Sequence, residues 1–106
     1  MVNNRMRAVH PGEVLREEYL RPLGMSPGEL AKALNVTKSR VSEIVSERRR
    51  VSANTALRLA RYFGGSESDA QGWINLQAAY DLKVAQIALG KEIAKQVQPR
   101  SNSTRS

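Results

Sequence analysis

The stretch from Ser26 to Ser46, SPGELAKALNVTKSRVSEIVS, decides the fold, because it predicts two short helices joined by a tight turn. Ser26 and Glu29 have the Ser-x-x-Glu spacing of a capping box, and Pro27 suits the first helical position. Asn35 follows the last apolar residue of this helix, and asparagine tolerates a positive φ better than most residues. We therefore expect the first helix to end at Asn35 and the second to begin almost at once.

The second helix separates an apolar side from a polar side. Thr37 is placed to cap it. Its inward-facing residues are expected to be Val41, Ile44 and Val45. The side chains left facing outward are Lys38, Ser39, Arg40, Ser42 and Glu43. Such a polar start is typical of a recognition helix in the major groove of DNA. An ordinary αα-hairpin is the alternative, but small Ala31 together with these spacings favours a helix-turn-helix.

The composition favours a single all-α domain. The chain has 106 residues, few aromatic residues (5%) and little alternation of the kind that predicts strands. No run of about 18 apolar residues predicts a membrane span, and no signal peptide opens the chain. The absence of cysteine excludes disulfides and fits a reducing cytoplasm, where we expect the protein to reside.

Positive charge is concentrated around the expected recognition helix. The formal net charge of the chain is +7, and residues 38–61 carry seven basic residues against two acidic ones. Three of the seven, Arg48, Arg49 and Arg50, directly follow the recognition helix. A solvated surface would explain a mild excess, but a concentrated one is what contact with phosphate requires.

The remaining segments predict three further helices and two tails. We expect residues 1–9 to form a flexible basic arm, residues 10–97 the domain, and residues 98–106 a disordered tail. Before the helix-turn-helix, the first helix of the whole chain should begin near Pro11 and stop at Pro22 and Gly24. Its inward-facing residues are expected to be Val14, Leu15, Tyr19 and Leu20. The fourth helix should begin after Ser52 and end at Gly64-Gly65. Its expected inward-facing residues are Ala56, Leu57, Leu59, Ala60 and Phe63.

The last helix is predicted to be too long for the domain. Ser66 and Asp69 form a second capping box, and the apolar pattern can run to about Val97. Roughly 30 residues at about 1.5 Å each span about 45 Å. Trp73, Leu76 and Tyr80 are expected to pack on the domain. The residues expected at a dimer contact are Leu76, Tyr80, Val84 and Ile87, with Leu89 and Ile93 as further candidates. A partner groove and an unsupported tail weakened by Gly90 are the alternatives.

Residues for catalysis or metal binding are scarce. His10 is the single histidine, and its place before Pro11 suits entry into a helix better than metal ligation. Glu17 and Glu18 are adjacent on a helix and point in different directions, so they cannot act as an acid and base pair. We therefore expect no enzyme activity, no cofactor and no metal.

Docking of the recognition helix assigns roles to its polar residues. The base-contacting residues are expected to be Lys38, Ser39, Ser42 and Glu43. The residues expected to contact phosphates are Ser26, Thr37, Arg40, Arg48 and Arg49. One domain reads too short a site alone, whereas a homodimer places two recognition helices about 34 Å apart. We therefore expect a palindromic operator.

Three motifs beyond the helix-turn-helix identify a family. They are HPGE at residues 10–13, TALRLA at residues 55–60 and W-x-N-L-Q-x-x-Y-D-L at residues 73–82. With them, the chain from His10 to Leu82 resembles the HigA-type antitoxins of the phage-repressor-like (XRE) helix-turn-helix superfamily. The resemblance implies a five-helix, DNA-binding dimer joined through its C-terminal helix. It also implies repression of the protein's own operon and neutralisation of a small basic toxin that cleaves mRNA.

The sequence departs from that family after the recognition helix. Members often have Asn-Gly where this chain has Glu47-Arg48. Arg48 in a left-handed conformation would be mildly strained, so the loop can differ from that of the family, and its contacts with DNA stay open.

Other functions remain open from the sequence alone. The protein can be a repressor without a toxin, or an adaptor that binds another protein through the long helix. An RNA-binding module is a further alternative, although a domain poor in aromatic residues offers few surfaces for stacking bases.

Overall fold

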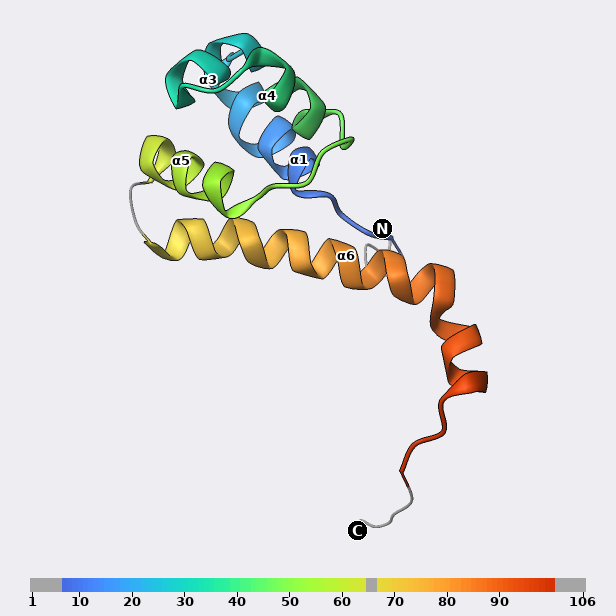
Figure 1. The fold of residues 1–106 in the computed structure, drawn as a ribbon. Helices are drawn as coiled ribbons and strands as arrows, with labels where there is room; N and C mark the ends of the chain where they lie inside the picture. Colours follow the sequence, from blue (N-terminus) through green and yellow to red (C-terminus); the bar gives the residue numbers. More distant parts are fainter. Residues whose placement is uncertain (1–6, 65–66, 101–106) are drawn as a thin grey trace.

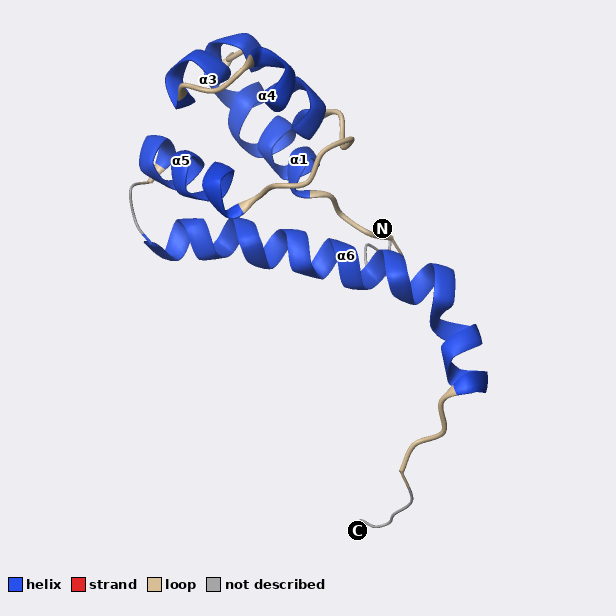
Figure 2. Cartoon of the chain, viewed as in Figure 1, coloured by secondary structure: helices blue, strands red, loops and turns tan. Residues whose placement is uncertain are grey.

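The computed structural model describes residues 7–64 and 67–100, and every regular element within them is helical (Figures 1 and 2). The first helix is continuous over α1 (Pro11–Val14), η2 (Leu15–Leu20) and α2 (Arg21–Leu23). It is followed by α3 (Pro27–Leu34), α4 (Lys38–Val45), α5 (Ala53–Phe63) and α6 (Glu67–Gln96). This confirms the predicted all-α, five-helix fold with a long C-terminal helix. No described helix has both the length and the hydropathy needed to cross a bilayer.

The first helix begins as predicted but passes through Pro22. His10 caps it, because its Nδ1 accepts a hydrogen bond from the Gly12 N–H at 2.8 Å. The prediction that Pro22 stops the helix is wrong, since α2 runs on to Leu23. The six residues of η2 form a wider π-helical turn that ends two residues before Pro22, a residue that lacks an N–H and crowds the preceding turn. The end comes at Gly24, which takes a left-handed φ of 63°.

The helix-turn-helix follows the sequence signals closely. The Ser26 hydroxyl accepts from the Glu29 N–H at 3.1 Å, and the Glu29 carboxylate accepts from the Ser26 N–H at 2.8 Å. Asn35 ends α3 in the left-handed region, with φ 59° and ψ 49°. The Thr37 hydroxyl caps α4 by accepting from the Arg40 N–H at 3.2 Å. The capping box, the turn and the second cap are therefore confirmed.

The core joins all five helices through aliphatic side chains. Its most completely buried members include Leu15, Leu30, Val41, Ile44, Val51 and Leu59. Leu57 was expected to face inward, and this is wrong, because 61% of its surface is exposed. Thr55 is buried instead, since α5 turns its Thr55, Ala56 and Leu59 side toward the core.

Helix α6 begins on the domain and continues beyond it (Figure 1). Trp73 is buried, and Leu76 packs against the core beside it. Tyr80 meets the His10 ring edge-on, with 4.8 Å between the ring centres. The longest dimension of the chain is 54 Å, and the predicted end near Val97 agrees with the observed end at Gln96. The predicted cap at Ser66, residues 1–6 of the arm and residues 101–106 of the tail lie outside the described residues.

Gly12 provides a test of how the recognition helix is supported. A Cβ at Gly12 would lie only 1.7 Å from the backbone oxygen of Ile44, so α1 and α4 must separate in Gly12→Ala. We expect that substitution to lower the free energy of unfolding by about 3 kcal/mol, as overpacking against backbone does. Gly72→Ala is the matched control, because a Cβ there meets nothing within 4 Å. Urea denaturation of both variants measures the difference, and equal stabilities would contradict the contact.

Candidate nucleic-acid interface

Helix α4 presents the predicted polar face. Lys38 and Ser39 are exposed in its first turn. Arg40, Ser42 and Glu43 are partly buried. The opposite side is buried in the core through Val41, Ile44 and Val45, as expected from the spacing. The accessible positions thus match the sequence analysis, while their contacts with DNA stay a prediction.

The starts of α3 and α4 lie next to each other. A Cβ at Gly28, in the first turn of α3, would sit 3.6 Å from the Cδ and Cε atoms of Lys38. Ser26 caps the same turn of α3, so its position is close to the Lys38 stem. Helix starts carry unpaired N–H groups and partial positive charge, and two of them side by side favour an anion. This arrangement suits Ser26 and Thr37 as the expected phosphate contacts.

The chain leaves α4 through a left-handed residue. That residue is Glu47, with a φ of 66°, and not Arg48, so the strain considered for a left-handed Arg48 does not arise there. The Glu47 N–H donates to the Ile44 carbonyl at 2.9 Å, and the Arg48 N–H donates to the Glu43 carbonyl at 2.8 Å. These two bonds close the helix in the manner of a Schellman motif, whose left-handed position usually holds glycine. Arg16 offsets the strain, since it donates to the Val45 carbonyl and to the Glu47 carboxylate.

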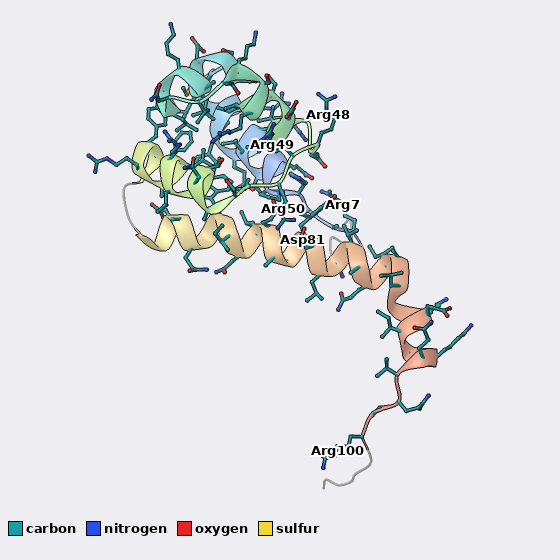
Figure 3. All side chains as sticks on the ribbon, viewed as in Figure 1. Arg7, Arg48, Arg49, Arg50, Asp81 and Arg100 are labelled. Carbon is teal, nitrogen blue, oxygen red and sulfur yellow. The ribbon has the colours of Figure 1, made fainter. Side chains whose placement is uncertain are left out.

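The arginines that follow α4 differ in their partners (Figure 3). Arg49 is paired with Glu43, its Nη2 lying 2.7 Å from the carboxylate. Arg50 turns toward α6 and pairs with Asp81 at 2.9 Å, and this contact is the main reason why the pKa of Asp81 is lowered. The Arg48 guanidinium forms no ion pair with a described residue, and its Nε donates to the Ser46 hydroxyl at 3.1 Å. Of the three, Arg48 is therefore the one whose charge is not already balanced by a neighbouring carboxylate.

Two polar residues that the sequence analysis missed position this surface. Gln77 is buried, with 3% of its surface exposed, and its oxygen accepts from the Val51 N–H at 2.7 Å. This bond fixes the end of the basic loop to α6. Asn54, in the first turn of α5, accepts from both Arg40 and Arg58. Gln77 gave a usable signal, because it is a polar residue among the apolar positions Trp73 and Tyr80, at helical spacing.

Comparison with known proteins identifies the architecture. The helix-turn-helix family matches residues 15–69. A solved Pseudomonas aeruginosa structure, antitoxin HigA with the higBA promoter, is 46% identical, with a TM-score of 0.84, and the match covers 90% of this chain and 100% of that one. The chain belongs to the HigA-type antitoxins of the helix-turn-helix family. A second solved structure, antitoxin GraA in complex with its operator, is 41% identical with a TM-score of 0.82, over 96% of this chain and 100% of that one. Virulence-associated protein I of Dichelobacter nodosus is 63% identical over 83 residues, which are 78% of this chain and 74% of that protein.

The Glu43–Arg49 pair makes a prediction for this HigA-type surface. In Glu43→Gln the Arg49 guanidinium loses its carboxylate, so it becomes available to a phosphate. We expect tighter binding to random-sequence duplex DNA and a steeper salt dependence, with a slope changed by up to about 1. Fluorescence anisotropy across a KCl series measures both. Glu18→Gln, an exposed site on η2 with the same change of charge, is the control. The interpretation fails if both variants respond alike.

Proposed function

We propose that this protein is a homodimeric repressor and antitoxin. It binds a palindromic operator in its own promoter and neutralises a cognate small basic toxin that cleaves mRNA. The observation that carries the proposal is the likeness to a HigA solved with its promoter DNA, which extends over 90% of this chain. A protein with this role acts where the chromosome is, which in a bacterium is the cytoplasm.

The residues on α4 divide the work of recognition. Lys38 can donate to guanine O6 and N7, Ser39 and Ser42 can pair with several bases, and Glu43 can accept from cytosine N4. Arg40, Thr37 and Ser26 surround the two helix starts, where phosphates are favoured. Arg48 and Arg49 follow along the loop and reach the backbone beside the groove. Both contacts of Arg49 are with Glu43 Oε1, so Glu43 can accept from a base through Oε2.

The distal part of α6 supports the dimer. Its large apolar side chains are exposed, and Val84 and Ile87 continue the face on which Leu76 and Tyr80 pack against the domain. A second copy that covers Val84 and Ile87 removes this apolar surface from water. It also presents two copies of α4 to one duplex, which is what a palindromic operator requires.

Two candidate functions can be distinguished by experiment: an antitoxin that neutralises a toxin, and a repressor that has no toxin partner. A gene beside this one that encodes a small basic protein, and co-purification of the two products, would support the antitoxin role. Operator binding without such a partner would favour a stand-alone repressor.

Operator reading is tested on a fragment of the protein's own promoter. We expect Lys38→Ala combined with Ser39→Ala to weaken binding to that fragment at least tenfold, since each good base contact is worth about 1–3 kcal/mol. Binding to a scrambled fragment of the same length should stay almost unchanged. Lys91→Ala, on an exposed part of α6, is the control for loss of one positive charge. Electrophoretic mobility shifts measure both fragments, and equal losses on the two would exclude base reading by these residues.

The dimer contact is tested by placing a charge on α6. Ile87 is 63% exposed, so Ile87→Asp costs the single chain little, but it buries an unpaired carboxylate in a dimer. We expect this variant to be a monomer by light scattering at micromolar concentration, with weaker operator binding. Asn75→Asp places the same charge on an exposed part of α6 that lies twelve residues before Ile87, and this variant should stay dimeric. A dimeric Ile87→Asp protein would show that the contact lies elsewhere.

A further inference from the structure

One neutral side chain holds two arginines from different helices. The Asn54 side-chain oxygen accepts from Arg40 Nη1 at 3.2 Å and from Arg58 Nε at 2.8 Å. Arg58 Nη1 also donates to the Leu34 carbonyl at the end of α3, at 3.0 Å. These bonds join the ends of α3, α4 and α5 around a pair of guanidinium groups. Asn54 itself is exposed, so the pair is reached from the surface.

The charge of this pair is not balanced within the described chain. Arg16, Arg21, Arg49 and Arg50 each contact a carboxylate, whereas neither Arg40 nor Arg58 forms an ion pair with any described residue. Helix α5 contains no aspartate or glutamate at all. Two cations that share one neutral oxygen repel each other, and an anion bound to both would relieve the repulsion.

The space next to the pair is open and free of carboxylates. A recess of about 580 Å³ lies between α3 and α5. Its lining includes Ala33, Asn54, Leu57, Arg58, Arg61 and Tyr62, so its charged groups are all positive. Arg40 does not line this recess, but it is joined to the lining because the Asn54 oxygen accepts from Arg40 Nη1. Arg40 lies in the first turn of α4, the helix expected to enter the major groove.

We propose that Asn54 aligns Arg40 and Arg58 as one site for a phosphodiester group of the operator. The planar donor forks of two guanidinium groups suit the oxygens of a phosphate. Contact with DNA then extends from the helix-turn-helix onto α5, with Arg58 as a further binding residue and Asn54 as a positioning residue. This inference rests on the proposed function, because it requires operator binding.

A purely structural role for the same residues makes a different prediction. The bond from Arg58 to the Leu34 carbonyl also satisfies the end of α3, as basic side chains commonly do. If that were its only role, loss of Arg58 would lower stability and leave the salt dependence of DNA binding unchanged. The number of phosphate contacts is therefore the quantity that separates the two.

The first experiment counts phosphate contacts. The dissociation constant for the promoter fragment is measured by anisotropy between 50 and 300 mM KCl. It is measured for the full-length protein without substitutions, called the full chain below, and for Arg58→Gln. Each phosphate contact contributes about 0.9 to the slope of log K against log salt. We expect Arg58→Gln to lose about that much, and Arg21→Gln, an exposed arginine on α2, to lose much less. Equal slopes for the full chain and Arg58→Gln overturn the proposal, as do equal losses in the two variants.

The second experiment keeps the site folded while blocking it. Asn54→Asp preserves an oxygen acceptor for both arginines but supplies the missing negative charge. We expect it to unfold at the same or a higher temperature and to bind the promoter at least tenfold more weakly than the full chain. Asn75→Asp, an exposed position on α6, makes the same chemical change far from the pair. The proposal is overturned if Asn54→Asp binds DNA as well as Asn75→Asp does.

Two further controls separate the possible failures. Inorganic phosphate is titrated into the protein while the Arg58 Nε–H signal is followed by NMR. Saturation by free phosphate, together with an unchanged salt slope in Arg58→Gln, would assign the site to a free anion and overturn the DNA contact. If the full chain does not prefer its promoter fragment over a scrambled duplex, the proposed function fails. If the full chain does prefer its promoter fragment, but Arg58→Gln has the same salt slope as the full chain, this inference alone fails.

Discussion

The recognition helix is held by a backbone contact that only glycine permits. Gly12 lies so close to the Ile44 carbonyl that a Cβ there would be 1.7 Å from its oxygen, so a residue with a side chain would force α1 and α4 apart. The start of α1 is fixed in turn by His10, a buried cap whose pKa is lowered by burial and whose neutral ring accepts the Gly12 N–H. His10 also lies against Tyr80 of α6. A continuous set of contacts therefore runs from the surface that is expected to face DNA to the helix that is expected to join two copies.

The positive charge that each arginine presents to solvent depends on whether it has a carboxylate partner, and not on its position in the sequence. The formal charge of +7 would suggest that every arginine near α4 is available to DNA. Instead, Arg49 and Arg50 are tied to Glu43 and Asp81, which lowers the charge they present and holds the loop in place. Arg40 shares only a neutral acceptor. In a surface of this kind, the arginines without a carboxylate define the strongest positive potential, and thus the expected path of the phosphate backbone.

Local signals in the sequence were reliable where one residue and its near neighbours determine the geometry. The Ser26 capping box and left-handed Asn35 depend on contacts within four residues, and both were predicted. The left-handed residue after α4 is Glu47 rather than Arg48, because the end of a helix is fixed by its last turn and by the distant Arg16. Leu57 faces solvent for a related reason. Amphipathic spacing predicts which side of a helix is apolar. How many residues on that side are buried depends on where the neighbouring helices lie.

Contacts between distant segments left fainter traces in the sequence. The pairing of Gln77 with the Val51 N–H spans 26 residues, and the sharing of Asn54 by two arginines depends on how three helices meet. Helix α6 shows the same limit. Leu82, Leu89 and Ile93 follow seven- and four-residue steps, on a different side from Ile87, and all are exposed. A helix with apolar residues on two sides is stable in water only when both sides are covered, so a single flat contact along Ile87 does not by itself account for this segment.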